Sequence, residues 1–230
     1  IEKPLYVSES IDISVPPYLP SNDIVIKDMR RMYSNIVELD NKVGLILKQL
    51  EQDKLLDETI IVFYTDHGGP LPREKRLLYD SGIRVPMIIR FPNKDRAGEL
   101  DNRLISFVDF APTLLSLINI NIPKYHQGKA FEGKYKSKNN RKYIHAAADR
   151  FDENYDMIRA VRDSRYKYLK NFYPEKPYYL PLEYREKMGT MQQLLTMEKN
   201  NELDSIQSLW FRKEKAKEEL FDTDLDPFEL

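Results

Sequence analysis

The sequence has 230 residues, of which 41% are hydrophobic and 32% are charged, so it is able to bury a core and lacks the composition of a disordered chain. The 36 Lys and Arg residues balance 37 Asp and Glu residues, and the net charge of −1 gives no basic field for binding nucleic acid. Cysteine is absent, which excludes disulfides and thiolate chemistry within these residues, and no apolar run is long enough to span a membrane.

The first part of the chain predicts an irregular segment followed by a long helix. Residues 1–22 include Pro4 and three further prolines, which disfavour regular structure. The chain has no initiator Met and no signal segment, so we expect it to be part of a longer protein. From 23 to about 53 the apolar residues follow helical spacing, which predicts one amphipathic helix. Asp40 falls on its apolar face, so we expect a buried, paired carboxylate.

Two apolar runs and a second helix follow. Residues 59–64 form a continuous run of apolar and β-branched residues, which is typical of a central strand in a parallel sheet covered on both faces. Residues 85–92 predict a second buried strand, and 108–120 predict a short helix. Glycines and a proline end the first strand at 65–70. Open α/β sheets place their ligands at such carboxyl ends of strands.

The composition changes after residue 122, where Lys, Gly and Asn become frequent. The pattern then predicts a surface connection over 124–142 and a strand over 143–148. A hairpin follows, with strands over 158–162 and 166–170, and then two polar helices over 182–199 and 202–217. We therefore expect an α/β layer over 1–122 and a smaller α+β subdomain with an antiparallel sheet over 123–230.

The polar residues after the first strand are the candidates for chemistry. Asp66 offers a carboxylate oxygen and His67 an imidazole nitrogen, so the pair can ligate a divalent cation, although such a dipeptide more often only shapes a turn. Lys75 lies eight residues after His67, with Arg73 and Arg76 beside it. This basic loop would attract an anionic substrate and stabilise charge on it, unless the cluster is simply solvated.

These residues resemble a known family. The block formed by Thr65-Asp66-His67-Gly68, Pro72-Arg73-Glu74-Lys75 and residues 79–86 is similar to the C-terminal signature of the sulfatases, which belong to the alkaline-phosphatase superfamily. Further segments resemble other parts of the same family, namely residues 33–50, 108–115, 219–222 and 226–227. Residues 16–20, 71–73 and 171–172 resemble more narrowly its sulfamidase-like (N-sulfoglucosamine sulfohydrolase-like) bacterial members. The resemblance implies part of an alkaline-phosphatase-like α/β sandwich, followed by the smaller subdomain.

The resemblance also implies an activity and roles for individual residues. Asp66 and His67 would be ligands of Ca²⁺, and Lys75 would contact the sulfate group. Arg73 and Arg150 are candidates for binding the sulfated saccharide, although Arg150 could equally form a salt bridge. The implied nucleophile is a formylglycine made from Cys or Ser in a Cys/Ser-x-Pro-x-Arg element, which this sequence lacks. We therefore expect a C-terminal portion of a calcium-dependent sulfatase acting on sulfate esters or sulfamates of a saccharide.

In this interpretation the missing N-terminal part of the enzyme is a partner of the chain, and the chain alone is inactive. The resemblance further implies a periplasmic or secreted location. Two alternatives stay open. A two-metal phosphatase or phosphodiesterase of the same superfamily would need more histidines after Asp66 and His67, and residues 68–125 contain none. A non-catalytic module that binds anionic glycans agrees with the absence of the nucleophile.

Overall fold

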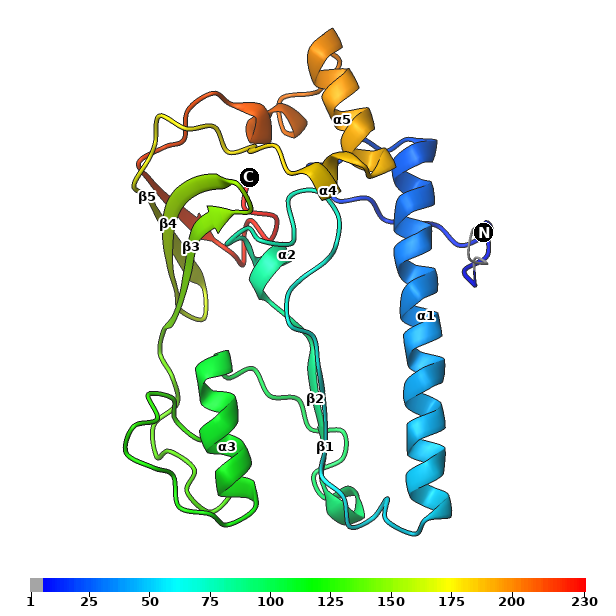
Figure 1. Ribbon diagram of the computed structural model, residues 1–230, viewed down its shortest axis with the longest axis vertical. Coiled ribbons are helices and arrows are strands. Elements are labelled where there is room, and N and C mark those ends of the chain that lie inside the picture. The colour runs from blue at the N-terminus through cyan, green and yellow to red at the C-terminus, as the bar shows by residue number, and fades with distance from the viewer. Residues whose placement is uncertain (1–5) are drawn as a thin grey trace.

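The structure, a computed structural model, describes residues 6–230, so Pro4 and the start of the predicted irregular segment lie outside the described residues. Figure 1 shows helix α1 (Asp23–Gln52) standing along one side of the molecule and helix α3 (Phe110–Leu117) on the other. Strands β1 (Ile61–Tyr64) and β2 (Met87–Arg90) lie between these two helices. The layered α/β arrangement expected for the first half of the chain is therefore present.

Helix α1 confirms the predicted long helix. Asn22 caps it, because its side chain accepts a hydrogen bond from the Val25 amide at 3.1 Å. The first half of α1 is buried at Val25 and Met29, and it packs against helix α5. Asp40 is exposed, so the prediction of a buried carboxylate is wrong. The reason is that the apolar face is largely open to solvent in this half of the helix, where Ile36 and Ile46 are exposed.

Strands β1 and β2 form a two-stranded antiparallel sheet, with Ile61 opposite Arg90 and Tyr64 opposite Met87. The prediction of a parallel sheet is wrong within the described residues. A parallel pair needs a crossover that returns the chain to the starting end of the first strand. Here the connection after β1 and the short helix α2 (Asp80–Ile83) lead straight into β2 from the opposite end.

The C-terminal half contains a four-stranded antiparallel sheet in the order β3-β4-β5-β6. Its strands are Ile144–Phe151, Asn154–Arg162, Tyr166–Asn171 and Glu218–Asp222. The predicted strand and hairpin are confirmed, and β6 is an additional strand that the sequence pattern did not indicate. The sheet completes the antiparallel subdomain expected after residue 122.

The two polar helices predicted near the end of the chain are only partly correct. The first is divided into α4 (Glu183–Glu186) and α5 (Gly189–Asn200). The second is wrong, because residues 202–217 contain only a short 3₁₀ helix, Gln207–Phe211, before the chain reaches β6. Within the described part of the chain, no helix combines the length and apolar character that crossing a membrane would require.

One hydrophobic core connects the two halves of the chain. The loop before α2 contributes Leu71, Leu77 and Tyr79, and helix α1 contributes Val25 and Met29. The four-stranded sheet adds Ala160 and Leu169, and the C-terminal helices and the residue before α4 add Leu182, Met191, Leu194 and Trp210. The loop that carries the predicted site is therefore packed on both parts of the molecule, and its backbone is held by the core.

Candidate functional site

Asp66 and His67 lie at the carboxyl end of β1, as the sequence predicts. The Asp66 side chain is 86% exposed and that of His67 is 34% exposed, and Asp66 Oδ1 lies 3.6 Å from His67 Nε2. The Nδ1 atom of the imidazole is 2.8 Å from the Gly68 carbonyl oxygen, which fixes the orientation of the ring. The two side chains therefore present one carboxylate and one ring nitrogen side by side.

The turn after His67 is closed against α2 by a glycine. The Gly68 amide donates to the Gly82 carbonyl at 2.9 Å. A Cβ atom at position 68 would lie only 1.8 Å from the Ser81 carbonyl oxygen, so any side chain there would push α2 away. Glycine at this position allows the backbone after the Asp66–His67 pair to approach α2 closely.

Lys75 lies on the loop between this turn and α2. Its amide donates to the Gly69 carbonyl at 3.0 Å, so the loop folds back onto the turn. The Lys75 side chain is half-buried, and its Nζ lies 5.9 Å from the centre of the Tyr184 ring. No carboxylate of residues 6–230 forms an ion pair with this ammonium group. Lys75 therefore carries an uncompensated positive charge on a well-held loop.

The neighbouring arginines of the loop have other partners. Arg73 is buried, and its guanidinium donates to the carbonyl oxygens of Phe228 and Glu229 at 2.9 and 2.5 Å. Arg76 forms an ion pair with Asp152 at 2.7 Å. Of the three loop cations that the sequence singled out, Lys75 is thus the one without an acidic or carbonyl partner among the described residues.

A cavity of about 720 Å³ lies between the end of β1, the loop before α3 and strand β3. Asp66 and His67 line it, together with Arg84, Phe107 and His145. Sequence analysis did not assign a role to these last three residues. Their only signal was position: Arg84 lies inside the sulfatase-like block, and His145 is an exposed residue between the apolar residues Ile144 and Ala146 of β3.

The structure does not bring every candidate to this cavity. Lys75 and Arg73 lie on the adjoining loop but do not line it, and Arg150 does not line it either. Arg150 is exposed on β3, and its Nε donates to the Asp152 carbonyl at 2.6 Å. The Asp66–His67 pair therefore lies at the cavity, and Lys75 lies on the neighbouring loop, whose backbone folds back onto the turn after His67 through the Lys75 amide and the Gly69 carbonyl.

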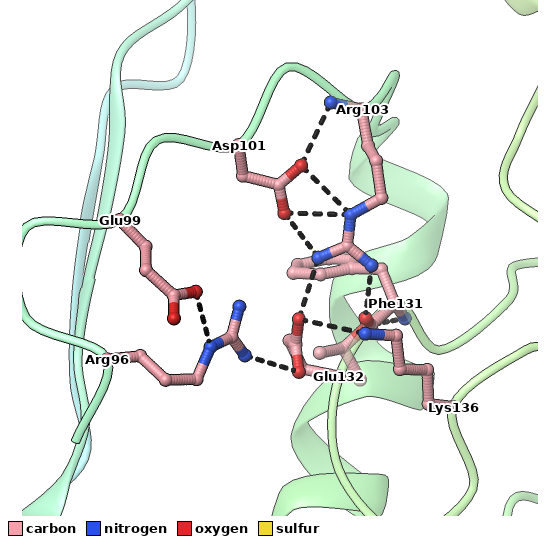
Figure 2. A network of polar contacts seen from close by, with 8 residues as sticks. Arg96, Glu99, Asp101, Arg103, Phe131, Glu132 and Lys136 are labelled. Carbon is pink, nitrogen blue, oxygen red and sulfur yellow. Dashed lines mark hydrogen bonds and ion pairs between the residues drawn. The ribbon is translucent and has the colours of Figure 1, made fainter.

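A cluster of arginines and carboxylates holds the cavity wall before α3 (Figure 2). Arg103 binds Asp101 and lies 2.7 Å from Glu132 Oε1, while Arg96 lies 3.1 Å from Glu132 Oε2. Burial alone would raise the pKa of Glu132, but the hydrogen bonds from Arg103 and Arg96 outweigh it and lower the pKa. Glu132 therefore stays ionised and ties the wall to the segment after α3.

The described residues do not form a complete calcium site. Ca²⁺ takes about six to eight oxygen ligands. Asp66 supplies a carboxylate of the right chemistry, whereas His67 supplies a nitrogen. Nowhere in residues 6–230 are three or more His, Cys, Asp or Glu side chains arranged to hold a metal ion. The residues present therefore fit one edge of such a site at most.

Comparison with known proteins identifies the class to which this fold and loop belong. The family model described as Sulfatase matches residues 10–120, and the model described as N-sulphoglucosamine sulphohydrolase, C-terminal, matches residues 73–217. The chain belongs to the sulfatase family, which confirms the resemblance seen in the sequence. The expected α/β fold with an antiparallel C-terminal sheet is confirmed as well.

Particular relatives extend this result. The chain is 59% identical over 229 residues to an ulvan-active sulfatase of Formosa agariphila, covering 100% of this chain and 38% of that protein. It is 29% identical over 118 residues to the N-sulphoglucosamine sulphohydrolase of Homo sapiens, covering 51% of the chain and 24% of that protein. A solved structure of a protein in complex with its substrate D-glucosamine-2-N,6-O-disulfate shares the fold with a TM-score of 0.61 and 24% identity, covering 87% of this chain and 35% of that one. The chain thus spans well under half the length of these relatives.

Proposed function

We propose that the protein containing this chain hydrolyses sulfate esters or sulfamates of a sulfated saccharide. Two observations carry the proposal: Asp66 and His67 lie side by side at the end of β1, and Lys75 on the adjoining loop has no ion-pair partner among residues 6–230. The identity of 59% to an ulvan-active sulfatase supports a polysaccharide substrate. The human relative is named for an N-sulfated sugar, which supports including sulfamates.

In this function the residues of the chain supply charge and orientation. Sulfate transfer develops negative charge on the sulfate oxygens, and a preorganised ammonium group stabilises that charge in the transition state. Lys75 has no ion-pair partner among residues 6–230, so its ammonium group is available for that role. Asp66 would be a ligand of the Ca²⁺ that sulfatases use, beside His67, with the other ligands coming from outside residues 6–230.

We further propose that the nucleophile lies outside these residues, because the chain contains no Cys and no Ser-x-Pro-x-Arg element. The chain alone would then be inactive and would act only with the remaining part of the enzyme. Arg73 is not carried into this proposal as a substrate ligand, since its guanidinium is committed to backbone carbonyls. A periplasmic or secreted location is proposed from the family resemblance.

The test is the variant Lys75→Ala in the parent enzyme, with sulfate release from a sulfated saccharide as the measurement. Removing a group that stabilises transition-state charge lowers kcat by on the order of 10²–10³. We expect kcat and kcat/KM to fall together by this factor. The control is Lys199→Ala, which removes an exposed lysine at the end of α5. A change in KM alone, or an equal loss in the control, would contradict the role of Lys75.

A further inference from the structure

The loop that carries Lys75 is anchored at its start by the end of the chain. Arg73, 5% exposed, donates hydrogen bonds to the carbonyl oxygens of Phe228 and Glu229. The Arg73 guanidinium also lies 4.0 Å from the centre of the Tyr79 ring and 4.8 Å from that of Tyr18. These contacts join the first residues of the loop to a segment more than 150 positions later, since the hydrogen bond to Phe228 spans 155 residues.

The same segment anchors the other end of the loop through a buried charge cluster. The Glu229 carboxylate accepts a hydrogen bond from the Asp80 amide. Lys167 is fully buried, and its Nζ lies 2.6 Å from Asp80 Oδ1 and 2.5 Å from Glu229 Oε1. Arg162 completes the cluster at 2.9 Å from Asp80 Oδ2. Figure 1 shows the C-terminal segment running beside α2.

The balance of charge in this cluster depends on Glu229. Burial would raise the pKa of Asp80, but Arg162 and Lys167 outweigh burial and lower it, so Asp80 is ionised. Burial raises the pKa of Glu229, and the nearby Lys167 acts against this, so the two buried cations face one carboxylate that is firmly ionised and one that depends on Lys167. Removing one member of a buried charge cluster leaves a partner without its counter-charge, which is strongly unfavourable. The anchor at Asp80 therefore holds most tightly when Glu229 is ionised and in place.

We propose that residues 226–230 form a clamp that positions Lys75, with Arg73 and Glu229 as the positioning residues. The two anchors flank Lys75, whose ammonium group lies 5.9 Å from the centre of the Tyr184 ring and forms no ion pair within residues 6–230. The position of that ammonium group is therefore set by the backbone of the loop and, through it, by the clamp. The inference rests on the proposed function, in which Lys75 meets the sulfate group.

Hydrogen exchange of the 230-residue chain tests the clamp without reference to activity. The variant is Glu229→Gln, and the matched control is Glu132→Gln. Both carboxylates are buried, at 2% and 8% exposure, and both form ion pairs, Glu229 with Lys167 and Glu132 with Arg96 and Arg103. Glu132 belongs to the cluster of Figure 2, and none of its partners lies on the Lys75 loop.

Peptides covering 69–80 should exchange at least about tenfold faster in Glu229→Gln, because local opening frees amides such as those of Lys75 and Leu77. Peptides covering β4 should keep their exchange rates, and Glu132→Gln should leave 69–80 unchanged. A uniform increase over the whole chain, or an increase in 69–80 for both variants, would overturn the clamp. If Glu229→Gln does not fold, Arg73→Lys gives the same comparison, since lysine keeps the charge but lacks the planar guanidinium whose two nitrogens reach the two carbonyls while it stacks on Tyr79.

The catalytic arm uses the parent enzyme and sulfate release. A small misplacement of a catalytic group lowers rates by up to about 10²-fold. We expect Glu229→Gln to lower kcat by about 10- to 100-fold with KM within about twofold, and the exposed-site control Lys199→Ala to leave both unchanged. An unchanged kcat in Glu229→Gln would overturn the positioning role. If the parent releases no sulfate, the proposed function fails, while the exchange experiment still decides whether the clamp exists.

Discussion

Glu74 shows how a single residue joins the loop to the core. It is 8% exposed, and its carboxylate accepts hydrogen bonds from the Leu71 amide at 3.0 Å and from the Tyr18 hydroxyl at 3.4 Å. Burial raises the pKa of Glu74 above its ordinary value of 4.5, although both hydrogen bonds act in the opposite direction. The ionised form of Glu74 is therefore less favourable in the folded chain than in the unfolded chain.

This environment predicts a pH dependence. A carboxyl group with a raised folded-state pKa stabilises the fold below its unfolded pKa, near 4.5, and that contribution is lost as the pH rises through the folded-state pKa. Glu74→Gln cannot ionise. The free energy of unfolding of the wild type should therefore fall relative to that of Glu74→Gln as the pH rises above about 4.5. Urea unfolding of both proteins between pH 4 and 8 measures this difference in the free energy of unfolding. A difference that does not change with pH would contradict the raised pKa of Glu74.

The sequence predicted those candidate site residues that lie close together in the chain and form one motif. Asp66, His67 and Lys75 lie within ten positions of one another, so a motif was sufficient to find them. Arg73 belongs to the same motif, and the sequence assigned it to substrate. Its actual partners are the carbonyls of Phe228 and Glu229, and no local pattern indicates a contact to backbone atoms at the far end of a chain.

In helix α1 the whole predicted helix forms, but only its first half is buried. Val25 is fully buried and Met29 is 3% exposed, whereas Ile36 and Ile46, on the continuation of the same stripe, are 54% and 62% exposed. Periodicity in the sequence predicts the helix and the direction of its apolar face. It does not tell which turns of that face have a packing partner, so the burial of Asp40 was predicted wrongly.

The two ends of α1 should respond differently to truncation of a side chain. Met29→Ala leaves a cavity in the core, which costs about 2–5 kcal/mol in the free energy of unfolding. Ile46→Ala removes atoms that already contact water, so its effect should stay within about 0.5 kcal/mol. Urea unfolding of the 230-residue chain measures both. Equal losses for the two variants would mean that the second half of α1 is covered in solution.

Strand β6 and the segment before it show where tertiary pairing overrides local preference. The charged sequence over 202–217 favoured a helix, yet Lys215 is buried and its Nζ binds Asp156 at 2.7 Å. The chain then pairs with β5, placing Glu219 opposite Leu169. A strand at the edge of a sheet gains its stability from its neighbour, and that neighbour lies about 50 residues earlier in this chain.

The two predicted parts of the molecule share one hydrophobic core, although the composition of the sequence changes between them. The hydrophobic core includes residues on both sides of residue 122. Buried ion pairs from Asp80 in the first part to Arg162 and Lys167 in the second cross the same boundary. The division into 1–122 and 123–230 stays a prediction. The shared core favours cooperative unfolding of both parts, because opening either part alone would expose these charges and apolar side chains.

Two spectroscopic probes test this cooperativity. Trp210, the single tryptophan, is 5% exposed in the C-terminal part, so its fluorescence reports unfolding there. Far-UV circular dichroism reports mainly α1, a helix of 30 residues in the first part. The two unfolding curves in urea should have the same midpoint. A separate, earlier transition of either probe would show that the two parts unfold independently.

The backbone conformation of Arg73 restricts how this position is able to vary. Its φ of 67° lies in the left-handed region, which glycine and asparagine occupy most readily. Yet only a guanidinium stacks on Tyr79 while donating to two carbonyl oxygens. Glycine or asparagine would remove the backbone strain but would lose the contacts of the guanidinium. Lysine would keep the positive charge but would also keep the backbone strain. Single substitutions therefore offer no gradual path away from arginine here, and replacement would require a compensating change at the other end of the chain.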